Sequence, residues 1–173
     1  SITYCSGSAE FNPKSNQNHA AVDIAALQSD MNLGVLKSNE CYQLFKNTGI
    51  EYGENLQGIE GIYLGGNQVL ARLSLALSLQ EKSSDYILHP CVMEAALQTA
   101  IGLALPQFGQ PLALASLEII QPCTPVMFAW VRYSEETAAQ VQGQNLDIDV
   151  FDEQGIVCIK MKGLSLGDEA NAS

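Results

Sequence analysis

The stretch from Cys91 to Leu105 is apolar and contains one charged side chain, Glu94. A helix that is apolar on nearly every face has to be buried on all sides, so this stretch limits the fold more than any other. Pro90 suits the first helical position, because an N–H there would have no partner within the helix. We therefore expect a central helix over residues 90–105 that the rest of the chain encloses.

Glu94 and Gln98 lie four residues apart and share one face of this predicted helix. Burial disfavours a charged carboxylate, so Glu94 is a candidate acid that is held protonated and donates to a leaving hydroxyl, with Gln98 orienting it. In the alternative interpretation, Glu94 points to solvent near the helix N-terminus, where a negative charge is favourable. The residues alone leave both interpretations open.

Two shorter helices are predicted before this stretch. Residues 23–30 predict a short helical turn, and residues 38–48 predict a longer helix that begins with Ser38 or Asn39 as its cap and stops at Gly49.

Most of the remaining segments alternate between apolar and polar residues with the period of a β-strand. Residues 59–63 and 68–75 predict a hairpin, with Gly65 and Gly66 supplying the positive φ angles of its turn. The later predicted strands cover residues 112–120, 126–133, 146–151 and 156–166, the last two joined by a turn at 152–155. Many strands and one buried helix predict a curved antiparallel sheet wrapped around that helix.

Composition excludes several classes of protein. A length of 173 residues favours one domain, and a net charge of −11 argues against nucleic acid as a partner. The five cysteines form no C-x-x-C pair and only two histidines accompany them, so we expect no metal site, no disulfide framework and a cytoplasmic location. No signal peptide or membrane span is expected, since the apolar stretch is too short.

Two motifs resemble those of polyketide synthase dehydratase domains. Residues 52–59, Tyr-Gly-Glu-Asn-Leu-Gln-Gly-Ile, resemble the Y-G-P-x-F-x-G-I motif, and residues 88–98 resemble L-H-P-x-L-x-D-x-A-L-Q. Residues 129–134, 146–150 and 157–163 resemble the closing strands of dehydratases from bacterial modular synthases of the trans-acyltransferase type. The resemblance covers nearly the whole chain.

The resemblance implies a fold and a set of site residues. The fold is the α+β hotdog, an antiparallel sheet wrapped around a central helix, here as the second half of a double hotdog. Glu94 takes the place of the family's catalytic aspartate, the acid for the departing hydroxyl, and Gln98 matches the family's glutamine. The motif residues implied to bind substrate are Tyr52, Gly53, His89 and Pro90, of which His89 is expected to shape the helix entrance rather than to act as a base.

This sequence departs from the family pattern at identifiable positions. Glu54 replaces the proline of the first motif, Leu56 replaces its aromatic residue, and Glu94 is one methylene longer than aspartate. The family's base, a histidine within H-x-x-x-G-x-x-x-x-P of the first hotdog, has no counterpart in this sequence. Because the elimination needs both an acid and a base, we expect this chain alone to be inactive.

The resemblance also divides the chain into segments. Residues 1–11 are expected to be a strand from the end of a missing N-terminal hotdog, 12–37 a linker, 38–168 the C-terminal hotdog, and 169–173 a tail. The start at Ser1 without a methionine suggests a piece of a longer protein.

The implied reaction is loss of water from a 3-hydroxyacyl thioester on an acyl carrier protein, which gives an enoyl thioester. No cofactor is expected to bind directly, since the substrate is carried on the phosphopantetheine of the carrier protein. The expected partners are that carrier protein, neighbouring synthase domains and a second copy of this chain. Two alternatives stay open: a non-catalytic scaffold or carrier-protein docking module, and an isomerase or conjugate-addition domain.

Overall fold

The computed structural model describes residues 21–47, 53, 57–74, 92, 94–99, 111–122, 124–133 and 145–166. Its labelled helices are α1 (Ile24–Asp30) and α2 (Ser38–Asn47), and its strands are β1 (Gly34–Lys37), β2 (Ile59–Leu64), β3 (Gln68–Ser74), β4 (Pro111–Ile119), β5 (Val126–Tyr133), β6 (Asn145–Asp152) and β7 (Val157–Leu166). Val92 and residues 94–99 are also helical.

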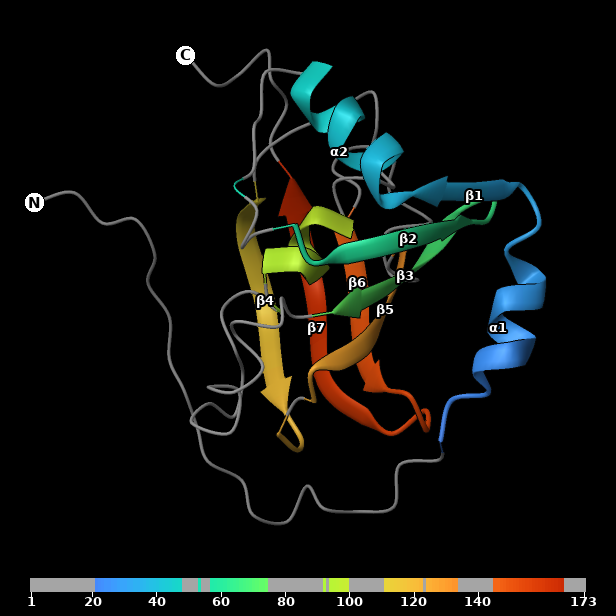
Figure 1. The fold of residues 1–173 in the computed structure, drawn as a ribbon. Helices are drawn as coiled ribbons and strands as arrows, with labels where there is room; N and C mark the ends of the chain where they lie inside the picture. Colours follow the sequence, from blue (N-terminus) through green and yellow to red (C-terminus); the bar gives the residue numbers. More distant parts are fainter. Residues whose placement is uncertain are drawn as a thin grey trace, which may run out of the picture.

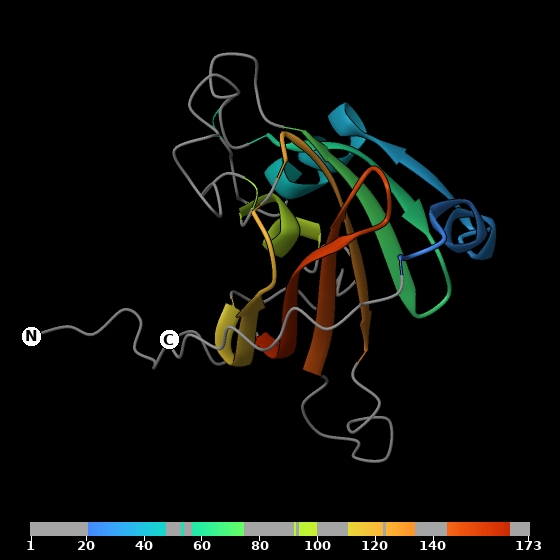
Figure 2. The same cartoon turned by 90° about the horizontal axis from the view of Figure 1, so that it is seen from below.

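The strands form one antiparallel sheet in the order β1-β2-β3-β5-β6-β7-β4. Figure 1 shows the helical residues 94–99, in yellow-green, in front of the sheet, and Figure 2 shows the sheet curving around them. Val92, Ala95 and Ala96 of this helix belong to the main core. The predicted α+β arrangement, a curved antiparallel sheet around one helix, is therefore confirmed, while the ends of the predicted helix at 90 and 105 lie outside the described residues.

Alternation of buried and more exposed residues in the middle of β7 shows which face of this strand meets the core. In β7, Ile159 and Met161 are buried in the main core, whereas Lys162 between the strand's apolar positions is exposed and Lys160 is only partly covered. Successive side chains of a strand point to opposite faces. Over residues 159–162, one face of β7 is therefore apolar and packs in the main core, and the other carries charge.

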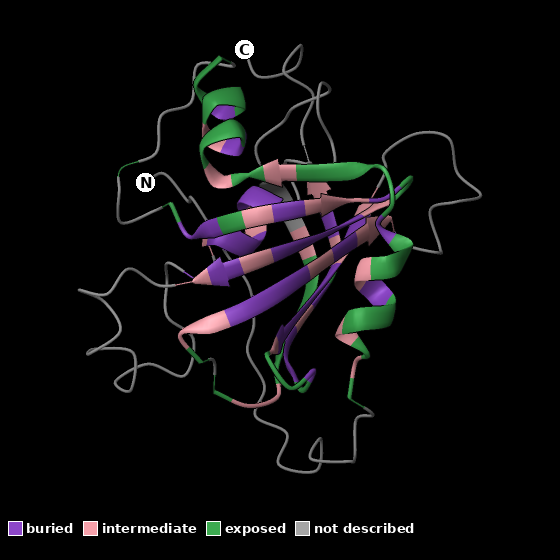
Figure 3. Cartoon of the chain, turned by 45° about the vertical axis from the view of Figure 1, so that its right-hand side comes forward, coloured by how far each residue is buried: buried purple, intermediate pink, exposed green. Residues whose placement is uncertain are grey.

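A second, smaller core lies on the opposite face of the sheet. Leu70 and Phe128 alternate with main-core residues of β3 and β5, so they point away from the central helix, and they pack against Leu27 and Met31 of the α1 region. Figure 3 shows α1 beside the sheet, mostly exposed, and Leu27 is the buried residue of this helix. The predicted helical turn is confirmed, and Asp23 caps it because its Oδ1 accepts the N–H of Ala26 at 3.1 Å.

The second predicted helix is confirmed as α2, but its N-terminus differs from the expectation. The helix follows β1 directly at Ser38, and the Lys37 N–H donates to Oε2 of Glu40 at 2.8 Å. A glutamate inside the first turn thus satisfies the entering backbone, instead of a cap by Ser38 or Asn39. The predicted stop at Gly49 lies outside the described residues.

The predicted hairpin is confirmed as β2 and β3, although the reason for its glycines is different. Neither Gly65 nor Gly66 has a positive φ. A Cβ on Gly65 would lie 2.7 Å from Sδ of Met31 and 2.9 Å from the carbonyl oxygen of Gln68. Close approach of neighbouring atoms, rather than a left-handed backbone, therefore requires a glycine at position 65.

The later strands agree with their predicted ranges to within about one residue at most ends. β1 was not predicted: residues 34–37 fall in the stretch expected to be a linker, yet they pair with β2 at the edge of the sheet. The described part of the chain contains no helix that is long and apolar enough to span a bilayer.

Candidate functional site

Glu94 and Gln98 occupy the helix that the sheet encloses, and their burial differs. Gln98 has no exposed surface, whereas Glu94, one turn earlier, is partly exposed. The buried Thr99 hydroxyl donates to the Ala95 carbonyl at 2.9 Å, so this polar side chain is satisfied within the helix. The carboxyl group therefore lies where the helix meets the edge of the core, and the amide lies inside the core.

The Gln98 amide is connected to two other elements through Tyr42 of α2. The Tyr42 hydroxyl donates to Gln98 Oε1 at 2.9 Å and accepts the N–H of Ile59 at 3.0 Å. Tyr42 was not among the residues selected from the sequence. The sequence did contain a signal for it, a tyrosine on the apolar face of α2. A tyrosine hydroxyl that is buried usually forms a hydrogen bond, so Tyr42 could have been expected to have a polar partner in the core.

The other predicted site residues are only partly covered by the structure. Tyr52, His89 and Pro90 lie outside the described residues, so their predicted roles stay predictions. Gly53 is described and exposed, and a Cβ added there would have no atom within 4 Å. Among the described residues, none comes close enough to require a glycine at position 53.

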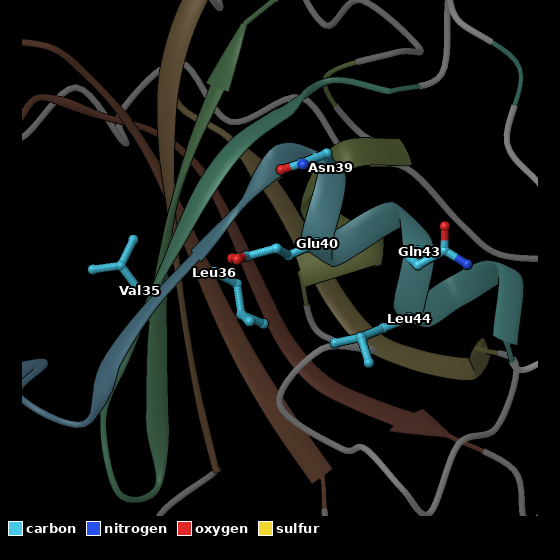
Figure 4. Close-up of a pocket in the computed structure, with 6 residues that line it drawn as sticks. All are labelled: Val35, Leu36, Asn39, Glu40, Gln43 and Leu44. Carbon is cyan, nitrogen blue, oxygen red and sulfur yellow. The ribbon is translucent and has the colours of Figure 1, made fainter.

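A surface cavity of about 610 Å³ lies at a different place, between β1 and α2. Figure 4 shows the side chains that line it, Val35, Leu36, Asn39, Glu40, Gln43 and Leu44. Neither Glu94 nor Gln98 is among them, and Val35 sits on an exposed edge strand. We therefore place the candidate chemistry at the central helix and not in this cavity.

The two described cysteines are poor candidates for a nucleophile. Burial raises the pKa of the Cys41 thiol to about 11, and burial also raises the pKa of Cys158. A thiol that stays protonated at neutral pH is unreactive. Within the described ranges, no group of three or more His, Cys, Asp or Glu side chains is placed to hold a metal ion.

The family follows from comparison with known proteins. A family model described as the polyketide synthase dehydratase N-terminal domain matches residues 19–171. The chain belongs to the polyketide synthase dehydratase family. Among curated proteins it is 41% identical over 166 residues to polyketide synthase PksN and 32% identical over 172 residues to PksM, both from Bacillus subtilis, in each case across 94% of this chain.

Solved structures support the same conclusion. A dehydratase domain of a trans-AT polyketide synthase from Brevibacillus brevis is 38% identical with a TM-score of 0.78, over 86% of this chain and 53% of that one. The dehydratase domain of the CurK module of the curacin polyketide synthase is 26% identical with a TM-score of 0.73, over 87% of this chain and 53% of that one. These neighbours confirm the predicted hotdog fold.

The match covers only part of each relative. This chain spans about half the length of the solved dehydratase chains and 3% and 4% of PksN and PksM, respectively. Which half of a dehydratase it represents, and the trans-acyltransferase type of its synthase, stay predictions.

Proposed function

We propose that this chain is the acid-bearing, C-terminal half of a dehydratase that removes water from 3-hydroxyacyl thioesters on an acyl carrier protein. The observation that carries the proposal is the placement of Glu94 at the edge of the core, on the same helix face as the fully buried Gln98. A proton donor has to be reachable by substrate, and its support has to be rigid. Glu94 meets the first condition because it is partly exposed, and the buried Gln98 on the same helix meets the second.

The proposed chemistry is an acid–base elimination. A base removes the α-proton, the electron pair forms the carbon–carbon double bond, and the C–O bond breaks as Glu94 protonates the departing hydroxyl to give water. The base is proposed to come from a histidine-bearing half, because this sequence contains no H-x-x-x-G-x-x-x-x-P. We therefore propose that the chain alone is inactive.

Two solved neighbours support an acid and a base as the working pair. One is an aspartate-to-asparagine variant and the other a histidine-to-phenylalanine variant of the CurK dehydratase, and both are described as inactive. They are 26% and 25% identical to this chain with TM-scores of 0.75 and 0.76. Glu94 keeps the carboxyl group at the position where the matching motif has aspartate.

The proposed partners follow from this reaction. The substrate arrives on the phosphopantetheine of an acyl carrier protein, and neighbouring synthase domains adjoin the chain in the cytoplasm. The similarity to the Brevibacillus dehydratase supports a synthase of the trans-acyltransferase type.

Self-association is supported by β4, where Leu117 and Ile119 are 43% and 44% exposed although they pair with the buried Met161 and Ile159 of β7. Leu117 and Ile119 lie on the same face of the sheet as these core residues, so they extend its apolar surface past the part that is covered.

The test is a mass-spectrometric assay of 3-hydroxyacyl pantetheine thioesters in the dehydration and hydration directions. It uses the chain alone and the chain joined to a histidine-bearing dehydratase half. We expect turnover only in the joined protein, and a loss of roughly 100-fold to 10,000-fold in Glu94→Gln. Glu118→Gln is the matched control, because Glu118 is an exposed glutamate of β4 that pairs with Lys160 on the outer face.

Each other outcome has a defined meaning. Full turnover in Glu94→Gln would show that Glu94 is not the acid. Absence of turnover in the joined protein would favour the scaffold or docking alternative, which the replacement of the motif proline by Glu54 and of the motif aromatic residue by Leu56 supports.

A further inference from the structure

Three large apolar side chains around β1 are exposed to solvent. Leu33, directly before the strand, and Val35 within it are 66% and 54% exposed, and Leu44 of α2 is also exposed. Among the described strands, β1 lies at one margin of the sheet and pairs with β2. Exposed apolar side chains beside an edge strand mark a place where another strand can add to the sheet.

The backbone of β1 directs hydrogen-bonding groups away from β2 at Val35. The Leu36 carbonyl oxygen lies 3.4 Å from the position of a Cβ on Gly61 of β2, so the backbone groups of Leu36 point toward β2. The Lys37 N–H points elsewhere, because it donates to Oε2 of Glu40 at 2.8 Å. Successive residues of an antiparallel strand alternate in this respect. The N–H and C=O of Val35 therefore point toward the margin of the sheet.

The cavity of about 610 Å³ between β1 and α2 lies beside this margin. Figure 4 shows Leu36 and Leu44 in the space between the strand and the helix, whereas Val35 projects from the other side of the strand. Asn39 and Gln43 add neutral polar groups to the lining of the cavity. A strand added to β1 would therefore place every second side chain over the cavity, where apolar and uncharged polar groups meet it.

The charge of the cavity indicates what kind of strand fits. Of the residues that line it, Glu40 is the charged one, and the whole chain has a net charge of −11. A carboxylate can accept several hydrogen bonds, so Glu40 can bind a basic side chain as well as the Lys37 N–H. An acidic partner would be repelled here, whereas a basic one would be attracted.

We propose that β1 binds an extended, basic segment of a partner protein or synthase domain, which adds to the sheet as a further strand. The backbone of Val35 pairs with this segment, its apolar side chains cover Leu33 and fill the cavity, and a lysine or arginine reaches Glu40. In this mode of recognition, main-chain hydrogen bonds supply affinity and pockets for alternate side chains supply specificity. The cavity is not lined by Glu94, so the inference does not depend on the proposed acid.

The test uses the peptide acetyl-Lys-Val-Thr-Val-Thr-Val-Lys-amide and the full chain labelled with ¹⁵N. In NMR titrations we expect the amide signals of residues 33–37 and 39–44 to shift. At saturation, exchange of the Val35 N–H with solvent is expected to slow at least tenfold, because the peptide accepts its hydrogen bond. The Leu36 N–H is expected to change little, since it already points toward β2.

Two altered peptides test the backbone and the charge separately. Methylation of every internal N–H of the peptide keeps its side chains and removes its donors, so we expect binding at least tenfold weaker. Replacement of both lysines by glutamates is also expected to weaken binding at least tenfold. In Glu40→Gln this difference between the basic and acidic peptides should shrink, whereas in the control Glu118→Gln, at the opposite margin of the sheet, it should persist.

A protein variant tests the position on β1. Proline is tolerated on an edge strand where the N–H faces away from the neighbouring strand, so Val35→Pro removes the donor and is expected to abolish binding. Leu117→Glu alters β4 at the opposite margin and is expected to leave binding unchanged. The methylated peptide decides the same question on the wild type if Val35→Pro does not fold.

Four results would overturn the proposal. These are absence of peptide binding, signal shifts confined to β4, equal binding of the methylated peptide, and equal binding of the acidic peptide. An acyl carrier protein that shifts the β1 signals while the basic peptide does not would also overturn it, in favour of a different partner at this margin.

Discussion

Gly155 provides a quantitative test of how the segment before α1 is held against the turn between β6 and β7. It lies in the turn between β6 and β7, where its φ is +82° and its carbonyl oxygen accepts the N–H of Val22 at 2.7 Å. A Cβ at this position would lie 2.1 Å from the carbonyl oxygen of Val22 and 3.0 Å from its nitrogen. Gly155→Ala therefore forces the backbone around Val22 to move away from the turn.

The expected loss of stability has three sources. A left-handed backbone costs a non-glycine residue about 1–2 kcal/mol. Loss of the Val22 hydrogen bond costs about 1 kcal/mol. Val22 also packs against the second core, and partial exposure of a valine of this kind costs about 1 kcal/mol. We expect Gly155→Ala to lower the free energy of unfolding by about 3–4 kcal/mol.

The assay is urea unfolding followed by circular dichroism, with Gly66→Ala as the control. Gly66 lacks a positive φ, and a Cβ there would have no atom within 4 Å. This control should therefore change stability by less than about 1 kcal/mol, in either direction. A Gly155→Ala protein within about 1 kcal/mol of wild type would refute the reasoning, because the clash involves backbone atoms that no side-chain rotation relieves.

Two further predictions concern the Cys41 thiol and the open face of β4. Burial raises the pKa of the Cys41 thiol from 9.0 to about 11, so the thiol stays protonated in the folded protein to a higher pH than in the unfolded chain. Its contribution to the free energy of unfolding is therefore present below pH 9 and is lost as the pH rises toward 11. A urea concentration at half-unfolding that does not fall over this pH range would contradict the prediction. Light scattering is expected to show that the wild type self-associates at micromolar concentration, and that Leu117→Glu weakens the association. A monodisperse wild-type monomer would argue against the proposed dimer.

Much of the fold could be predicted from the sequence, because the signals are local. The range of β5 agrees at both ends with the alternating stretch 126–133, and the central helix follows from an apolar stretch with one charge. Both predictions depend on burial of side chains that are close together in the chain. The strand β1 gave no such signal, since its burial pattern is mostly exposed and it owes its conformation to pairing with β2.

The candidate site was predictable only in part for a related reason. Glu94 and Gln98 are marked by their polarity within an apolar helix. The partner of Gln98 is Tyr42, separated from it by 56 positions, and nothing in the local pattern of α2 indicates which group its hydroxyl meets. The role of Gly65 was also missed, because the crowding that requires it comes from the carbonyl oxygen of Gln68 and from Met31 on another segment, which no local pattern indicates.

The core beneath α1 limits where another protein can contact this domain. Over β3, β5 and β6 the sheet is covered on one face by the central helix, and on the other face Leu70, Phe128 and Phe151 already pack with α1 residues. A carrier protein or neighbouring domain therefore cannot lie flat on these middle strands without displacing α1. Among the described strands, β1 and β4 lie at the two margins of the sheet, so a partner that pairs with the sheet would meet it there.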